Sequence, residues 1–143
     1  MNLTAHFNSL LKKWAERFKV AVPKLQISKE GNTDMTQAAY FEMRQTISMN
    51  PLYTAPAREH KMLLRFMEYT LGHEFGHHVI WSGHGRRASE HEANMIAKEL
   101  TGLTPREAEH LLEAYLPFTP RGFEEQDMIE EEMKRAALEQ EEC

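Results

Sequence analysis

Apolar residues near the start of the chain recur every three to four positions, the spacing of the buried face of an amphipathic helix. This pattern predicts a helix over residues 3–19, and Pro23 should end it. Residues 25–27 then alternate between apolar and polar, as a short strand does. We therefore expect a helix followed by the first strand of a sheet.

Between residues 38 and 49 the apolar positions repeat with a period of two. This repeat predicts two more strands with a turn near Arg44-Gln45, or one bent strand. Gly31-Asn32 is a turn signal ahead of them. Asn50-Pro51 should close the sheet region, because proline cannot donate a hydrogen bond to a neighbouring strand.

Helical spacing returns over residues 57–81 and predicts a long second helix, with a loop from Ser82 to Arg87. Two glycines, Gly72 and Gly76, lie inside this helix, where each costs about 1 kcal/mol relative to alanine. We interpret them as positions that another element approaches closely. The stripe that should face the core contains Met62, Phe66, Tyr69, His73, His77 and Ile80.

Three further helices follow. Ser89 with Glu92 forms a capping box that predicts a helix start, and Gly102 should end that helix. Thr104-Pro105 begins the next helix in the same manner. A last, acidic helix should run from about 123 to 140. The expected core faces consist of Ala93, Ile96, Ala97 and Leu100, and then of Ala108, Leu111, Leu112 and Tyr115.

Together these elements predict an α+β fold with a small three-stranded sheet. A length of 143 residues fits one core. We assign residues 1–117 to the main domain and 118–143 to an acidic C-terminal helix or tail. This tail contributes strongly to the net charge of −5, because residues 117–143 hold nine acidic and three basic residues. The remainder is close to neutral and carries no basic footprint for nucleic acid.

Composition narrows the chemistry and the cellular setting. The only cysteine is Cys143, so a metal site would have to use histidine and carboxylate ligands. No apolar run approaches the roughly 18 residues that cross a bilayer. The first eleven residues do not resemble a signal peptide. We therefore expect a cytoplasmic protein without a membrane segment.

His73-Glu74-Phe75-Gly76-His77 has the spacing H-E-x-x-H. On a helix, two histidines four residues apart lie on one face and can bind one zinc ion. The carboxylate of Glu74 can then reach a zinc-bound water without binding the metal. Zinc lowers the pKa of that water, and Glu74 accepts its proton. The motif therefore predicts hydrolysis of peptide bonds in a protein or peptide substrate, with Glu74 as the catalytic base.

A catalytic zinc needs a third protein ligand and one open position. Glu90 is the candidate, because it lies in the first turn of the next helix on the face of Ala93 and Ala97. Glu92 and His91 remain alternative ligands, although capping already accounts for Glu92. Asn94, one turn after Glu90, can hydrogen-bond a ligand imidazole from the second shell.

The two motifs, H-E-x-x-H and Glu90-His91-Glu92-Ala93-Asn94-x-x-Ala97, resemble those of the gluzincin metallopeptidases. The second motif is most similar to that of the ImmA/IrrE-type peptidases, and it also resembles those of the M48 group and the small archaeal minigluzincins. The similarity as a whole spans about residues 23–101. The resemblance implies zinc bound by His73, His77 and Glu90, Glu74 as base and Asn94 behind a ligand. It also implies that residues 45–51 form the edge strand of the substrate cleft. The loop between His77 and Glu90 is short for this group, and many relatives have Asp where Asn94 stands.

Other positions complete the sequence hypothesis. We expect His78, His84 and His110 at the surface, and one of His84, Arg86 or Tyr115 could stabilise an oxyanion. The acidic tail is either a solvated face or, as the resemblance to minigluzincins permits, a segment that blocks the cleft of a zymogen. The alternative function is a regulatory binding protein on the same scaffold, which partners a transcriptional repressor and has little general proteolysis.

Overall fold

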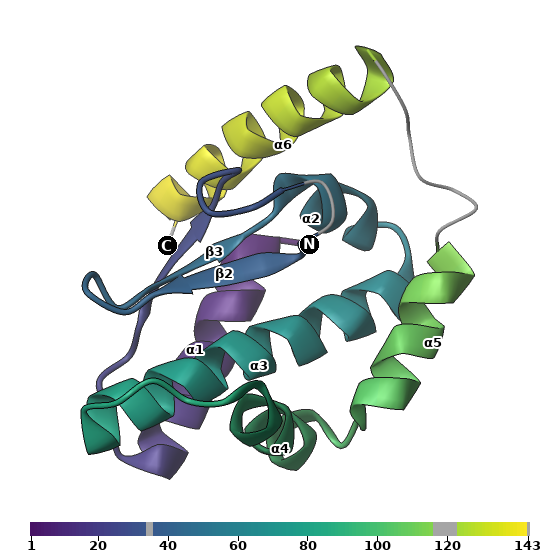
Figure 1. The fold of residues 1–143 in the computed structure, drawn as a ribbon. Coiled ribbons are helices and arrows are strands. Elements are labelled where there is room, and N and C mark those ends of the chain that lie inside the picture. The colour runs from purple at the N-terminus through teal and green to yellow at the C-terminus, as the bar shows by residue number, and fades with distance from the viewer. Residues whose placement is uncertain (34–35, 116–122, 143) are drawn as a thin grey trace.

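The computed structural model describes residues 1–33, 36–115 and 123–142 (Figure 1). Within these ranges it is an α+β fold with one small three-stranded sheet, as the sequence predicts, and it has six helices where the sequence analysis expects five. None of the described helices combines the length and the apolar character needed to cross a bilayer. The elements are α1 (Leu3–Phe18), β1 (Lys24–Ile27), β2 (Ala38–Phe41), β3 (Thr46–Met49), α2 (Pro51–Ala57), α3 (Lys61–His84), α4 (Glu90–Thr101), α5 (Pro105–Tyr115) and α6 (Phe123–Glu142).

The sheet has the order β1-β3-β2, with β1 parallel and β2 antiparallel to β3. The prediction that residues 45–51 form the edge strand of a cleft is therefore wrong. β3 is the central strand and is buried at all four positions, while β2 lies at the edge. The period-two pattern locates strands but carries no information on their order in the sheet.

The chain after the sheet also differs from the expectation. Asn50-Pro51 ends β3 but also begins α2, because the side chain of Asn50 accepts a hydrogen bond from the backbone N–H of Leu52 and proline occupies the first helical position. The predicted helix over 57–81 is α3, which starts later and extends through Ser82 and Gly83 to His84. Gly85, at φ 66°, caps it in the left-handed conformation that glycine adopts without strain.

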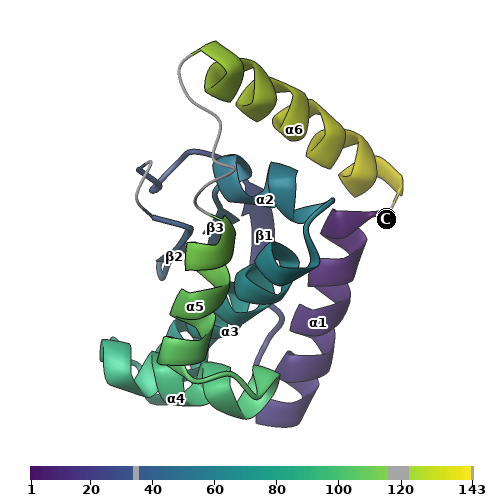
Figure 2. The same cartoon turned by 90° about the vertical axis from the view of Figure 1, so that its right-hand side faces the viewer.

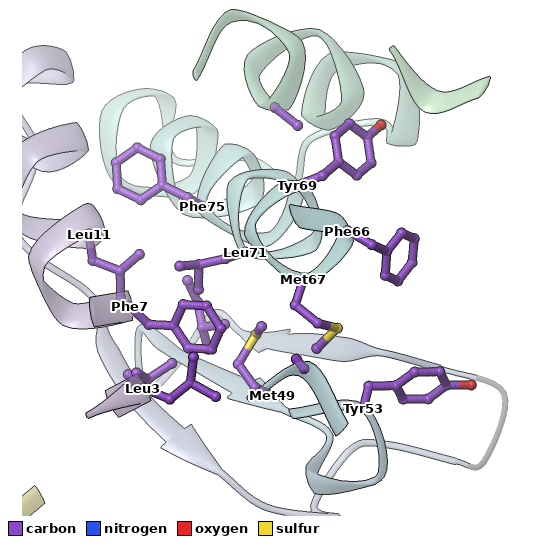
Figure 3. Packing of buried hydrophobic residues seen from close by; sticks show 14 of the residues in the cluster. Leu3, Phe7, Leu11, Met49, Tyr53, Phe66, Met67, Tyr69, Leu71 and Phe75 are labelled. Atoms are coloured by element: carbon purple, nitrogen blue, oxygen red, sulfur yellow. The ribbon is translucent and has the colours of Figure 1, made fainter. Parts of the chain in front are cut away.

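The core forms where α1 and the inner faces of α2 and α3 meet the sheet (Figure 3). Phe7 and Leu11 of α1 meet Leu71 and Phe75 of α3, and all four side chains are fully buried. Met62, which the sequence pattern placed on the buried stripe, is 54% exposed, and Leu63 occupies the core instead. Each fully buried side chain of this size contributes about 1.5–3 kcal/mol, so this cluster fixes the position of α3.

The starts of α4 and α5 confirm the predicted capping. Ser89 accepts a hydrogen bond from the backbone N–H of Glu92, whose carboxylate accepts one from the N–H of Ser89. Thr104 and Glu107 exchange the same pair of bonds. Gly102 ends α4 at φ 78°. The capping box fixes the start of α4 at Glu90. Glu90 is therefore the first residue of the helix that follows the H-E-x-x-H motif in the chain.

The acidic helix α6 packs along α2 and the start of α1, at the opposite end of the molecule from α4 (Figures 1 and 2). Buried ion pairs fasten it there. Arg58 donates to Glu132 at 2.7 Å and to both carboxylate oxygens of Glu139 at 2.7 and 2.9 Å. Thr4 and the backbone N–H of Leu3 also donate to Glu139. The face of α6 that carries Glu132 and Glu139 is therefore not solvated, although other acidic side chains of α6 are exposed.

Candidate metal centre

Two helices bring the four predicted site residues together. α3 supplies His73 and His77, whose Nε2 atoms lie 3.3 Å apart. α4 supplies Glu90, whose carboxylate oxygens lie 2.9 Å from Nε2 of His73 and 3.2 Å from Nε2 of His77. Potential ligand atoms of His73, Glu74 and His77 all lie within 4.8 Å of one another. The arrangement thus gathers two imidazoles and two carboxylates around one point.

Asn94 fixes the orientation of one imidazole. Its Oδ1 atom lies 2.7 Å from Nδ1 of His73 and also accepts a hydrogen bond from the hydroxyl of Tyr69 at 3.1 Å. An amide oxygen can only accept, so Nδ1 of His73 carries a proton, and in the neutral ring Nε2 then presents its lone pair to the site. Sequence reasoning found Asn94 but not Tyr69, which faces α4 from α3 (Figure 3). Its helical spacing marked it only as a core position.

Small residues allow α3 and α4 to approach this closely. A Cβ atom added to Gly76 would stand 2.9 Å from the Cα of Ala93, closer than real Cβ contacts occur. At Gly72 the nearest atoms would be 3.4 Å away, an ordinary contact. The interpretation of these glycines as sites of close helix packing is confirmed, and Gly76 is the stricter of the two. This approach is what puts Glu90 within reach of the imidazoles.

Glu74 lies beside the histidines and is largely buried. It is 8% exposed, and burial, together with the charge of Glu90, raises the pKa of Glu74 to about 8. Burial and the neighbouring His73 lower the pKa of His77, which favours the neutral imidazole that a metal requires. A cation at the centre would stabilise the ionised form of Glu74, because opposite charge favours the charged state of a carboxyl group.

The donor set fits a tetrahedral metal ion with nitrogen and oxygen ligands. Ligands at 2.0–2.1 Å from a tetrahedral zinc lie about 3.3 Å from one another, and the Nε2 atoms of His73 and His77 have that separation. With the proton of His73 on Nδ1, its Nε2 lone pair faces the carboxylate of Glu90 at 2.9 Å. Two acceptors this close repel each other unless a cation or a proton lies between them. The Glu90 side chain is 76% exposed, so one side of the centre is open.

Two pockets flank the centre, and both are lined by Glu74 and Glu90. The first, about 400 Å³, is here called the α5 pocket; it lies between residues 36–38, α3 and α5. Its walls include Phe66, Tyr69, Ala108 and Leu112. The second, about 320 Å³, is called the Arg87 pocket and is lined by Tyr40, Glu42, Trp81 and Arg87 in addition to the shared carboxylates. The centre is thus the middle of a longer cleft.

The remaining candidates are the residues predicted to stabilise an oxyanion, His84, Arg86 and Tyr115. Arg86 is paired with Glu92 at 2.7 and 3.0 Å at the surface, and His84 is exposed at the end of α3. The side chain of Tyr115 lies outside the described residues. Among the described residues that line the two pockets, the Lys or Arg side chain is that of Arg87, which the sequence analysis did not single out. It donates to Glu42, the residue that follows β2. Its neighbour Arg86 carries the same sequence signal, so only the fold distinguishes them.

The expectation that His78 lies at the surface is wrong. His78 is fully buried, donates from Nε2 to the carbonyl oxygen of Ala21 at 2.7 Å, and accepts at Nδ1 from the hydroxyl of Tyr40 at 2.8 Å. Burial, with a smaller effect of Glu42, raises the pKa of Tyr40 to about 12, so the phenol keeps its proton. His78 therefore ties the edge strand β2 to the helix that carries the centre. His84 and His110 are exposed, as expected.

Two alternative ligands can also be placed. The carboxylate of Glu92 is engaged by Arg86 and by the backbone N–H of Ser89, as its capping role predicts. His91 is exposed on α4. The carboxylate of Glu90, by contrast, lies within 3.2 Å of both imidazoles, those of His73 and His77. Glu90 is therefore the third member of the cluster.

Comparison of the chain with protein-family models, with curated proteins and with solved structures finds no match to any of them.

Proposed function

We propose that this chain is a zinc-dependent peptidase with a compact zincin-like architecture. The observation that carries the proposal is the convergence of His73, His77 and Glu90 within 2.9–3.3 Å of one another, beside a buried carboxylate. His73, His77 and Glu90 would hold the metal, and Asn94 would orient His73. When bound, a zinc ion supplies Lewis acidity and a water molecule of lowered pKa.

Glu74 would move the protons. It is buried, lies beside the cluster and lines both pockets, so it can reach the scissile bond from the cleft floor. In the proposed reaction Glu74 accepts a proton from water as its oxygen attacks the carbonyl carbon. The same proton then passes to the amide nitrogen as the carbon–nitrogen bond breaks, which leaves a carboxylic acid and an amine.

The edge strand β2 would hold the peptide. The N–H of Asn50 donates to the carbonyl oxygen of Gln37, so these two residues form a hydrogen-bonded pair. From this pair onwards, every second residue along β2 hydrogen-bonds to β3. The N–H and C=O groups of Ala38 and Tyr40 therefore point away from β3, towards the open edge. An extended peptide can add to such an edge through main-chain hydrogen bonds, whatever its side chains.

The test is the variant Glu74→Gln, with Glu99→Gln on the exposed surface of α4 as matched control. Glu74→Gln should bind one zinc per chain, measured by elemental analysis, and lose hydrolysis of a casein or quenched-peptide substrate by at least about 100-fold. Glu99→Gln should retain both properties. Full activity of Glu74→Gln, or a purified wild-type protein that binds no zinc at micromolar concentration, would exclude the proposal.

A further inference from the structure

An ion pair crosses the Arg87 pocket from one wall to the other. Glu42 is the residue that follows β2, and Arg87 lies in the connection between α3 and α4. Nε of Arg87 donates to the carboxylate of Glu42 at 2.7 and 3.0 Å, and Nη2 lies 2.5 Å from the same group. Both residues line the pocket, so their side chains meet across it. We call Arg87 and Glu42 the cross-cleft pair.

The backbone holds both residues of the cross-cleft pair in place. The N–H of Gln45 donates to the carbonyl oxygen of Glu42, which fixes Glu42 at the turn between β2 and β3. Arg87 stands between Gly85, the cap at the end of α3, and Ser89, the cap at the start of α4. In Figure 1 the turn after β2 and the end of α3 lie on the same side of the molecule. The pair can therefore open by rotation of side chains alone.

The two ends of the cleft differ in this respect. The described residues that line the α5 pocket include no lysine or arginine, so a pair of this kind does not cross that end within the described part of the chain. Arg86, the residue before Arg87, pairs with Glu92 in the first turn of α4, on its own side of the cleft. A peptide bound at the centre would thus meet an ion pair in one direction only.

We propose that the cross-cleft pair selects substrates by the length of the chain on one side of the cleaved bond. The Arg87 pocket, about 320 Å³, has room for a chain that ends there. A chain that continues past it requires the pair to open and is therefore disfavoured. The inference rests on the proposed peptidase function. Because the side chain of Arg87 is 82% exposed, the bias should be that of a surface ion pair, about two- to fivefold.

The test uses quenched peptides with one cleavable segment and blocked termini, extended by neutral Gly-Ser residues on the N-terminal side, the C-terminal side or neither. Extension on one side should lower kcat/KM about two- to fivefold, and extension on the other side should leave it unchanged. Arg87→Gln and Glu42→Gln should each remove this penalty. The double variant should add nothing further, because all three proteins lose the same pair.

Arg17→Gln is the matched control, because it breaks the exposed pair of Arg17 with Glu99, residues that line neither pocket. It should keep the penalty of wild type. No penalty in wild type, or equal penalties on both sides, would overturn the proposal. A fall of kcat/KM for every peptide in Arg87→Gln would also overturn it, because Arg87 would then act by binding substrate.

Peptide binding separates this inference from the peptidase function. If zinc-loaded wild type cleaves none of the peptides, the peptidase function fails, and fluorescence anisotropy with labelled versions of the same peptides tests the length selection. An extension that weakens binding about two- to fivefold in wild type and Arg17→Gln, but not in Arg87→Gln or Glu42→Gln, would support it. Equal affinities of extended and short peptides in wild type, or no binding of any peptide, would refute it.

Discussion

The contact between Gly76 and Ala93 gives a sharp test of how the centre is held together. In Gly76→Ala the added methyl group would meet the Cα of Ala93 at 2.9 Å, its carbonyl oxygen at 3.0 Å and Cβ of Ile96 at 3.3 Å. Two of these three atoms belong to the backbone, so a side-chain rotation cannot relieve the overlap. Carbon atoms are most favourably placed about 3.5–4.0 Å apart, so α4 must retreat by about half an ångström or more.

Two opposing terms set the stability of Gly76→Ala. Alanine in place of glycine favours a helix by about 1 kcal/mol, whereas overpacking costs about 1–3 kcal/mol. We therefore expect a change between neutral and a loss of about 2 kcal/mol in the free energy of unfolding. Gly72→Ala is the matched control. Its new methyl would lie 3.4 Å from its nearest neighbours, so it should gain up to about 1 kcal/mol.

The two variants should differ most in metal binding. Retreat of α4 carries Glu90 away from His73 and His77, and metal sites tolerate only about 0.2 Å of change in a ligand distance. Zinc affinity, measured by competition with a chromophoric chelator, should fall at least about tenfold in Gly76→Ala and stay unchanged in Gly72→Ala. Urea denaturation of the metal-free proteins supplies the stability values. If Gly76→Ala bound zinc as tightly as wild type, the close approach of the helices would not be what places Glu90.

Four further predictions concern other contacts. Asn94→Ala should weaken zinc binding about 10- to 100-fold, measured by the same chelator competition, and an unchanged affinity would show that Asn94 does not orient His73. Arg58→Met should lower the free energy of unfolding by about 3–5 kcal/mol, because it leaves two carboxylates buried without their partner. Deletion of residues 118–143 removes both carboxylates together with the contacts of α6 on α1 and α2, so it should lower the melting temperature, and a deleted protein as stable as wild type would contradict this. Burial acts to raise the pKa of Glu139, but the hydrogen bonds and charge of Arg58 outweigh it and leave that pKa lowered. The stabilisation from Glu139 should then be complete above its unfolded pKa of about 4.3 and be lost as pH falls through the lower folded pKa, so urea denaturation between about pH 7 and pH 3 should show a steeper loss for wild type than for Glu139→Gln.

The tail hypothesis changes in the light of Arg58. The described part of the C-terminal segment packs on α1 and α2, and the described residues that line the two pockets come from other elements. From the acidic residues of this segment, the sequence analysis predicted either a solvated face or a segment that blocks the cleft. Arg58, the partner that α6 finds in this structure, lies more than 70 residues earlier in the chain. Inhibition by the tail remains a prediction that the deletion would also test.

Local signals explain which features could be predicted from the sequence. The capping boxes at Ser89 and Thr104 were predictable because their hydrogen bonds join residues three apart. The proximity of His73 and His77 follows from helical periodicity alone. Glu90 could also be predicted. The capping box fixes where α4 begins, and the glycine at position 76 indicates that a neighbouring element packs close to the motif helix.

Features that depend on distant partners were not predictable. The order of strands in the sheet, the burial of His78 and the position of Arg87 in the cleft each depend on contacts between segments far apart in the chain. The rule that histidine is usually exposed is a statistical one, and it fails at His78 because Tyr40 and the carbonyl of Ala21 satisfy both ring nitrogens. Asn50-Pro51 closes the sheet as predicted, but the same two residues also begin α2, and this helix start was not predicted although its signal is local.

The packing of α3 against α4 also bears on the order of events in folding. All four residues of the candidate centre and Asn94 lie between positions 73 and 94, within one helical hairpin. Contacts over such short sequence separations form early, because little chain entropy is lost in closing the connecting loop. A metal ion bound there would add its binding energy to the hairpin itself. The metal could therefore act during folding as a nucleus, before the long-range contacts of β2 and α6 have formed.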